Sequence, residues 1–147
     1  MMRINGRNYA PREGGLLAML TARDIMSTGV QTVTARTSVL ALAQLLSARH
    51  ISGAPVVSDD GAVIGVATEA DLLSKTGATV GDIMTARVAR VAEDTPVQEI
   101  ARLLRRLHIH RVPVMRGERL IGIVSQGDIV RAIAHADHPE AIVGSDE

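Results

Sequence analysis

A hydroxyl followed three residues later by a carboxylate occurs twice in this chain, each time after a glycine and two apolar residues. At the start of a helix this spacing suits a capping box, in which the two side chains bind free backbone N–H groups. The same geometry suits a nucleotide, because a helix N-terminus favours phosphate and a carboxylate can accept from both hydroxyls of a ribose. Taken alone, each motif favours the capping box. The two stretches are Gly65-Val66-Ala67-Thr68-Glu69-Ala70-Asp71 and Gly122-Ile123-Val124-Ser125-Gln126-Gly127-Asp128.

The two motifs belong to an internal repeat. Asp24-Ile25-Met26 recurs 58 residues later as Asp82-Ile83-Met84, and Pro55-Val56 recurs as Pro113-Val114. One residue then drops out of a turn, so that Asp71 and Asp128 are 57 residues apart. A repeat of this length indicates one supersecondary unit used twice. The two copies are expected to pack about a pseudo-twofold axis and to form two related sites.

The elements that must position these residues follow one order in each repeat. The pattern predicts strand, helix, strand, strand, helix, hence an α/β fold of two tandem β-α-β-β-α repeats. Thr21 and Thr79 are candidate N-caps of a short helix that precedes the first strand, and Thr37 and Thr95 are expected to cap the long helix. The expected strands are residues 31–34, 54–57 and 63–67 in repeat one and residues 89–92, 112–115 and 120–124 in repeat two.

Four segments are expected along the chain. Residues 1–20 fall outside the repeat and, with Asn5-Gly6, Pro11 and Gly14-Gly15, are typical of a flexible arm or surface loop. Repeat one is residues 21–77 and repeat two is residues 78–135. Residues 136–147 are expected to form an acidic, poorly ordered tail.

Composition excludes several classes of function. Sixteen basic and sixteen acidic residues cancel, so no general attraction to nucleic acid or anionic membrane is expected. The chain has no apolar run of membrane-spanning length and no convincing signal peptide. It also lacks Phe and Trp, on which single-strand and RNA binders stack bases, and it lacks Cys. We therefore expect a cytoplasmic protein with neither a nucleic-acid nor a membrane partner.

The pattern Gly-apolar-apolar-Thr/Ser-x-x-Asp after an apolar-Pro-Val strand resembles the CBS domain (cystathionine β-synthase domain) family. The resemblance covers both repeats, residues 21 to about 134, including Asp-Ile-Met at each start. In this family two CBS domains form a Bateman module, which binds adenosine-containing ligands. The resemblance implies that the Asp holds the ribose, that the Thr or Ser approaches phosphate, and that the base lies between aliphatic residues and strand backbone. The implied ligand-binding residues are Ser52, Gly53, Ala54, Pro55, Thr68 and Asp71 in repeat one, and His110, Arg111, Val112, Pro113, Ser125 and Asp128 in repeat two.

The repeats differ just before the Pro-Val strand. Repeat two has His110-Arg111 where repeat one has Ser52-Gly53. In the nucleotide-sensing γ subunit of AMP-activated kinase, a protein of this family, a His-Arg pair at this point contacts phosphate. The second site is therefore expected to suit a charged phosphate tail. The first is expected to be empty or to prefer an uncharged or differently placed group.

Metal binding and catalysis are not expected. His108 and His110, two apart on a predicted strand, could face one metal, but no nearby carboxylate pair would complete the site; packing or a helix C-terminus is the favoured role of His108. The sequence holds no Ser/His/Asp arrangement, no paired catalytic carboxylates and no P-loop.

The sequence thus predicts a stand-alone Bateman module, not an enzyme, that senses an adenosine-containing ligand (AMP, ADP, ATP or one like S-adenosylmethionine) and signals to a regulated protein. No cofactor is required. A homodimer is expected through apolar, small-residue helices such as residues 39–48. The alternative is a structural dimerisation module with empty sites. A bound small molecule distinguishes the two hypotheses.

Overall fold

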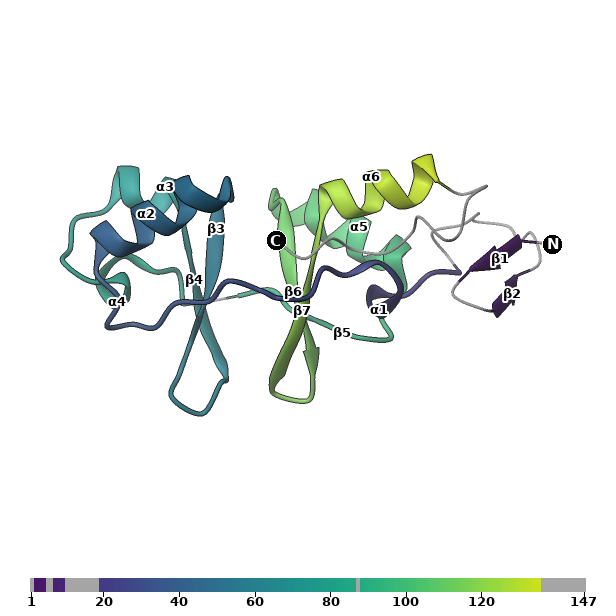
Figure 1. The fold of residues 1–147 in the computed structure, drawn as a ribbon, viewed down its shortest axis with the longest axis horizontal. Coiled ribbons are helices and arrows are strands. Elements are labelled where there is room, and N and C mark those ends of the chain that lie inside the picture. Colours follow the sequence, from purple (N-terminus) through teal and green to yellow (C-terminus); the bar gives the residue numbers. More distant parts are fainter. Residues whose placement is uncertain (1, 5–6, 10–18, 87, 136–147) are drawn as a thin grey trace. The chain divides into compact units, whose positions relative to one another are not determined.

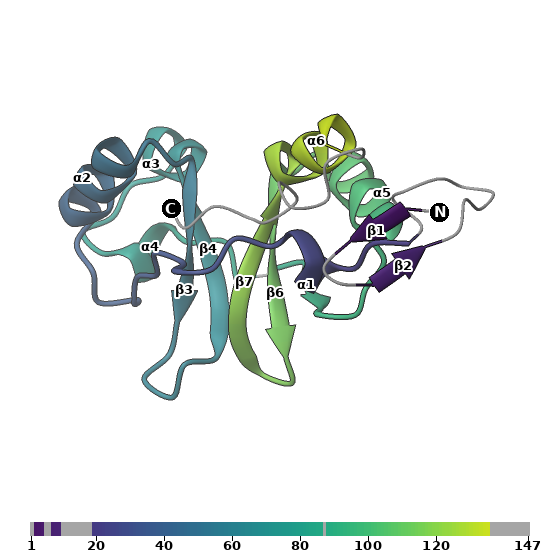
Figure 2. The same cartoon turned by 45° about the vertical axis from the view of Figure 1, so that its right-hand side comes forward.

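The computed structural model describes residues 2–4, 7–9, 19–86 and 88–135. Its contacts divide the chain into two units (Figures 1 and 2). The repeat-one unit comprises Gln31–Ala89 and Glu118–Leu120. The repeat-two unit comprises the described parts of Met1–Val30, Arg90–Gly117 and Ile121–Asp146. The units therefore do not follow the sequence repeats strictly, because the start segment of each repeat (residues 21–27 and 79–85) lies in the unit of the other.

The long helices are α2 (Val39–Arg49) and α5 (Val97–Leu107). The predicted caps Thr37 and Thr95 are wrong by one residue, since Ser38 and Pro96 occupy the N-cap positions. The Thr37 hydroxyl instead accepts from the backbone N–H of Thr34 over 3.1 Å, and Thr95 accepts from Ala92 over 3.1 Å. Each hydroxyl binds a backbone N–H of the turn that precedes the helix and therefore does not cap the helix.

Each unit contains one antiparallel hairpin that carries the Pro-Val strand. In the repeat-one unit β3 (Gly53–Val57) pairs with β4 (Val63–Thr68). In repeat two β6 (Arg111–Arg116) lies next to β7 (Arg119–Ser125), which belongs to the repeat-two unit from Ile121 on. Both turns contain a glycine with a left-handed backbone, Gly61 at φ 86° and Gly117 at φ 60°. In both views β3 and β4 extend away from helices α2 and α3 (Figures 1 and 2).

The first predicted strand of each repeat is short. In repeat two it is β5 (Val91–Ala92), which pairs in parallel with β6. In repeat one it is a single parallel bridge between Val33 and Val56.

The remaining helices are α1 (Ala22–Ile25), α3 (Glu69–Ser74), α4 (Val80–Ile83) and α6 (Gln126–Ala134). Thr21 and Thr79 cap α1 and α4 as predicted, and Thr68 and Ser125 cap α3 and α6. The mixed α/β fold with two tandem repeats is confirmed.

The exchanged start segments are held by burial. Val80 and Ile83 of α4 lie in one apolar cluster with repeat-one residues such as Leu42, Val56 and Ala67. In the repeat-two unit Ala22 and Ile25 of α1 are likewise buried. Apolar burial of this kind is the main favourable contribution to folding, so the start segments are part of each core.

Within the N-terminal arm, β1 (Met2–Ile4) and β2 (Arg7–Tyr9) pair as antiparallel strands. The sequence predicted a flexible arm or surface loop for this stretch, and these six residues are paired strands instead. The predicted acidic tail at 136–147 lies outside the described residues. Among the helices that the structure describes, none combines the length and apolarity needed to cross a membrane.

Candidate functional site

The start segment of repeat two is fixed against strand β4. Thr85, which follows α4 by two residues, exchanges two backbone hydrogen bonds with Val66, each 2.9 Å long. This approach needs a glycine at position 65, because a Cβ there would lie 2.8 Å from the carbonyl oxygen of Thr85. The repeat therefore places the hydroxyl of Thr85 beside the end of β4.

The repeat-two unit has the same arrangement. Ser27 N donates to Ile123 O over 2.8 Å, and Ile123 N donates to Ser27 O over 3.0 Å. A Cβ on Gly122 would lie 2.9 Å from the carbonyl oxygen of Ser27 and 2.6 Å from the sulfur of Met26. Glycine is thus required on both hairpins for the same physical reason, the close approach of a second backbone.

Asp71 is buried at the start of α3, and one of its oxygens completes a capping box. Oδ2 accepts from the backbone N–H of Thr68 over 3.0 Å and from its hydroxyl over 3.1 Å, while Asp71 N donates to that hydroxyl over 3.2 Å. The capping interpretation of this motif is therefore correct, and it uses only one carboxylate oxygen.

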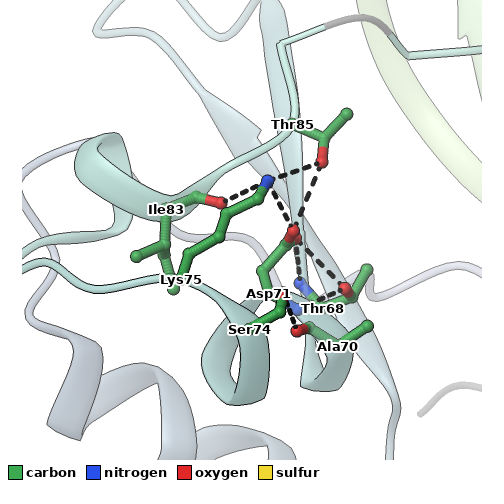
Figure 3. A network of polar contacts seen from close by, with 7 residues as sticks. All are labelled: Thr68, Ala70, Asp71, Ser74, Lys75, Ile83 and Thr85. Carbon is green, nitrogen blue, oxygen red and sulfur yellow. Dashed lines mark hydrogen bonds and ion pairs between the residues drawn. The ribbon is translucent and has the colours of Figure 1, made fainter.

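The other oxygen of Asp71 faces the exchanged start segment (Figure 3). Oδ1 accepts from the hydroxyl of Thr85 over 3.3 Å and from the ammonium of Lys75 over 2.8 Å. Lys75 Nζ also donates to the carbonyl of Ile83 over 3.1 Å and contacts Thr85 Oγ1 at 3.4 Å. Burial alone would raise the pKa of Asp71, but Lys75 and the two donors of Thr68 outweigh it and lower that pKa below its ordinary value. Asp71 is therefore an ionised acceptor at neutral pH.

Asp128 has the corresponding arrangement at the start of α6. It is buried, and its Oδ2 accepts from the backbone N–H of Ser125 over 2.9 Å, while Asp128 N donates to the Ser125 hydroxyl over 3.2 Å. Its Oδ1 accepts from the hydroxyl of Ser27 over 3.3 Å and forms an ion pair with Arg131. Each repeat thus presents one carboxylate oxygen to a hydroxyl and a cation.

A capping box by itself does not mark such a site. Thr79 and Asp82 form the same box at the start of α4, where the carboxylate is exposed and Oδ2 accepts from Thr79 N and Ala78 N, each over 3.0 Å. What distinguishes Asp71 and Asp128 from Asp82 is burial together with the contacts of the second oxygen.

The structure gathers the predicted repeat-one residues at the start of β3. Gly53 lies opposite Thr68 in the β3–β4 register, and Ser52 O accepts from the first N–H of α3, that of Glu69, over 2.9 Å. A Cβ on Gly53 would lie 3.0 Å from a methyl carbon of Thr68. Ala54 and Pro55 are buried on β3 next along the chain. The six predicted residues therefore lie at one end of this hairpin and in the first turn of α3, which follows it.

The predicted repeat-two residues gather in the same way. His110 O accepts from Gln126 N over 2.9 Å, and the exposed His110 ring lies 3.2 Å from the side-chain oxygen of Gln126. Arg111 is half-buried at the start of β6, and its buried Nε has no hydrogen-bond partner among the described residues. Val112 and Pro113 follow as buried residues of β6. The guanidinium of Arg111 therefore has a buried N–H donor to which no described residue offers an acceptor.

The two histidines considered for a metal do not lie on one strand. His108 is the C-cap of α5, with a left-handed backbone at φ 54°, and β6 begins only at Arg111. The role of His108 at a helix C-terminus is confirmed, and the prediction that it shares a strand with His110 is wrong. In the part of the chain that the structure describes, no three His, Cys, Asp or Glu side chains form a group suited to a metal ion.

Sequence reasoning missed four residues that touch the two aspartates. Ser27 and Thr85 each follow the repeated Asp-Ile-Met, so the repeat itself carried a hydroxyl at this position in both copies. Lys75 and Arg131 lie four and three residues after their aspartates, a spacing that brings side chains together on a helix.

The sequence matches the CBS domain family twice, over residues 22–76 and 80–135. The chain belongs to the CBS domain family. It is 32% identical over 121 residues to hypoxic response protein 1 of Mycobacterium tuberculosis, a match that covers 77% of this chain and 85% of that protein. The family thus accounts for the repeat and for both aspartate motifs.

Solved structures of other CBS-domain proteins carry ligands. The crystal structure of CBSX2 from Arabidopsis thaliana in complex with AMP matches with a TM-score of 0.77 and 31% identity, covering 80% of this chain and 98% of that one. The CBS domain pair of protein MJ0100, in complex with 5′-methylthioadenosine and S-adenosyl-L-methionine, matches with a TM-score of 0.73 and 30% identity, covering 78% and 96%. A structure of hypoxic response protein 1 with two coordinated zinc ions matches with a TM-score of 0.68 and 31% identity, covering 77% and 98%.

Proposed function

We propose that this chain is a regulatory module that binds an adenosine-containing ligand and conveys the occupancy of its sites to a partner protein. One observation carries the proposal. In each repeat a buried aspartate caps a helix with one oxygen and presents the other to a hydroxyl from the start segment. That second oxygen is the acceptor that the diol of a ribose needs, and it occurs twice.

The relatives support the class of ligand. CBSX2 was crystallised with AMP, and the MJ0100 domain pair with 5′-methylthioadenosine and S-adenosyl-L-methionine. All three ligands contain adenosine, and this chain aligns with more than nine-tenths of each protein chain. We therefore propose that the ribose binds Asp71 or Asp128.

Repeat two has the groups for an anionic tail. Ser125 caps a nine-residue helix whose N-terminus carries positive partial charge. Arg111 lies on the adjacent strand with a buried N–H that has no partner among the described residues, and a phosphate oxygen would supply one. His110 lies at the same strand start. We propose that this repeat takes a nucleotide phosphate beside Ser125.

Repeat one lacks the His-Arg pair and has Ser52-Gly53 instead. We propose that its site, built on Thr68 and Asp71, binds phosphorylated ligands more weakly than that of repeat two. The base would lie along the aliphatic strand residues, Ala54 and Pro55 here and Val112 and Pro113 in repeat two.

The role proposed is regulation without catalysis, in the cytoplasm, as a homodimer. The alternative is a structural dimerisation module whose aspartates serve only as helix caps. The sequence repeats 21–77 and 78–135 are retained as the proposed domain boundaries. The proposed partner is a separate, regulated protein.

Titration calorimetry tests the proposal. Protein freed of any co-purified nucleotide is titrated with AMP, ADP, ATP and S-adenosylmethionine, and Asp128→Asn serves as the site variant. We expect binding of at least one ligand, weakened in the variant by about 1.5–3 kcal/mol, the range for hydrogen bonds to a charged group. Asp82→Asn, which alters a capping box with an exposed aspartate, is the matched control. An absence of heat with all four ligands at millimolar concentration would exclude the proposal and favour the structural alternative.

A further inference from the structure

The carboxylate of Asp71 is saturated by groups of this chain. A carboxylate has about four lone-pair positions, two on each oxygen. Oδ2 accepts from Thr68 N and Thr68 Oγ1, at 3.0 and 3.1 Å. Oδ1 accepts from Lys75 Nζ and Thr85 Oγ1, at 2.8 and 3.3 Å. A ribose diol brings two further donors, so at least one of these four must leave before the diol can bind.

Lys75 is the donor best able to leave. The backbone N–H of Thr68 is fixed by the helix start, whereas the Lys75 side chain is flexible and 42% exposed. In the structure its ammonium contacts three acceptors: Asp71 Oδ1, the carbonyl of Ile83 and the hydroxyl of Thr85 (Figure 3). Its release from Asp71 therefore costs free energy. The lowered pKa of Asp71 agrees with an ammonium bound to that carboxylate.

Repeat two provides a comparison. Asp128 receives one described donor on Oδ2, Ser125 N, and two on Oδ1, Ser27 Oγ and Arg131. One acceptor position is therefore not filled by a described group, and the diol meets a less crowded carboxylate there. The cation also comes from a different helical position, three residues after the aspartate rather than four.

We propose that Lys75 is an intramolecular competitor for the ribose-binding oxygen of Asp71, and that it biases the repeat-one site toward anionic diol ligands. This inference rests on the proposed function. A neutral nucleoside must displace the ammonium and gives it no new partner. A nucleotide displaces it as well, but its phosphate attracts the released charge. A cationic ligand such as S-adenosylmethionine repels it.

The affinity test uses Lys75→Met, which keeps the chain length and removes the charge. Adenosine and AMP are titrated against the full chain carrying Asp128→Asn, so that heat reports repeat one. We expect Lys75→Met to bind adenosine about twofold to fivefold more tightly, the range for releasing a half-exposed ion pair, and to gain less for AMP. Arg36→Met is the matched control, because it removes a cation from the exposed Arg36–Asp59 pair of the same unit.

A second measurement does not depend on the Asp128 variant. Lys75 is the only lysine, so uniform ¹³C,¹⁵N labelling gives a single lysine side-chain signal and leaves the three N–H donors of its ammonium intact. In wild-type protein, saturating adenosine should shift the signal of the Lys75 ε-carbon and ammonium as the ammonium leaves Asp71. Amide signals of Thr68 and Thr85 report in the same sample whether repeat one is occupied.

The outcomes separate the two proposals. If adenosine, AMP, ADP, ATP and S-adenosylmethionine perturb neither these amides nor those of Ser125 and Asp128, the proposed function fails and this inference fails with it. If repeat one is occupied while the Lys75 signal stays unchanged and Lys75→Met leaves the adenosine affinity as it was, the competitor inference alone is overturned. Equal gains for adenosine and AMP would overturn the bias toward anionic ligands.

Discussion

The hydroxyl of Thr85 lies 3.3 Å from Oδ1 of Asp71, although the two residues belong to different sequence repeats. Ser27 and Asp128 stand in the same relation, also at 3.3 Å. Both hydroxyls are placed by a backbone pairing with the strand that ends in the capping residue. Each candidate site is therefore completed by the start segment of the other repeat.

Removing the Thr85 hydroxyl tests this relationship. Thr85→Val keeps the shape of the side chain and removes the donor to Asp71, so we expect a loss of about 0.5–1.5 kcal/mol in the free energy of unfolding. Urea denaturation at neutral pH is the measurement, and Thr32→Val at an exposed position is the control. An unchanged free energy would show that the hydroxyl does not stabilise the carboxylate.

The close approach of the Ser27 backbone to Gly122 predicts a larger loss of stability than the loss of the Thr85 hydroxyl. A Cβ there would lie 2.9 Å from the carbonyl oxygen of Ser27, so Gly122→Ala forces backbone to move and should destabilise the protein by about 1–3 kcal/mol. Gly127→Ala is the control, since its Cβ would meet nothing nearer than 3.6 Å among the described residues and position 127 is helical. Thermal unfolding that ranks the two variants in the opposite order would contradict the close approach.

The lowered pKa of Asp71 predicts a pH dependence of stability. Its ordinary value is 3.8, and the folded-state pKa lies below this. As pH falls the unfolded state binds the proton first, so the stabilisation is complete above 3.8 and is lost as pH falls through the folded pKa. Asp71→Asn should therefore be less stable at neutral pH and should lose less stability on acidification. Urea unfolding at about pH 7 and about pH 3 measures both; parallel losses in variant and wild type would contradict the assignment.

Arg111 should set the preference of repeat two for phosphate. Arg111→Met keeps most of the apolar stem and removes the guanidinium, so we expect AMP binding to weaken by about 1.5–3 kcal/mol and adenosine binding to change little. Calorimetry with both ligands is the measurement, with the exposed Arg119→Met as control. Equal losses for AMP and adenosine would indicate a role in folding instead.

The two aspartates should differ in their effect on AMP binding. Asp71→Ala should cost less AMP affinity than Asp128→Ala, because repeat one lacks the His-Arg pair. Calorimetry with AMP measures both, and an equal or larger loss from Asp71→Ala would contradict the role of the pair.

The exposed apolar helix residues predict a homodimer. Val130 and Ile133 of α6 are 63% and 54% exposed, and Leu73 of α3 is 89% exposed. Burying such residues against a second copy is favourable, and a twofold dimer is the commonest closed assembly. Light scattering at micromolar concentration should give twice the chain mass, and Val130→Glu with Ile133→Glu should reduce it. A single-chain mass for wild type, with and without AMP, would refute the dimer.

Much of the fold could be predicted because its signals are local. Hydrophobic periodicity located α2 and α5, and the threonines before Asp-Ile-Met identified the caps of α1 and α4. Thr37 and Thr95 were misassigned because a threonine caps a turn as readily as a helix, and only the partner of its hydroxyl decides which. The arm was predicted in part from Asn5-Gly6, but this dipeptide is also frequent in hairpin loops, and β1 and β2, which flank it in the sequence, pair as strands.

The candidate sites were predictable only in part. The resemblance supplied the aspartates and their neighbours on the same hairpin. It did not indicate Ser27 and Thr85, because their role depends on which hairpin the start segment meets. Lys75 and Arg131 could have been suspected from helical spacing, but whether an ammonium contacts a carboxylate or water depends on burial. Long-range pairing and desolvation are properties of the folded chain, and short sequence motifs do not encode them.

Gly65 of β4 and Gly122 of β7 each leave room for the start segment of the other repeat, which bears on how such a chain could have arisen. In this arrangement the start segment of a repeat does not pack against the glycine of the same repeat, and a single ancestral repeat would leave both without a partner. Two separate copies of such a repeat could associate, with the start segment of each packed against the glycine of the other. Gene duplication with fusion would join the two copies, so that the exchange of start segments would take place within one chain. The two repeats could then diverge in sequence. The two repeats of this chain differ at such positions: repeat two has His110-Arg111 where repeat one has Ser52-Gly53, and the cation on the aspartate is Lys75 in repeat one and Arg131 in repeat two.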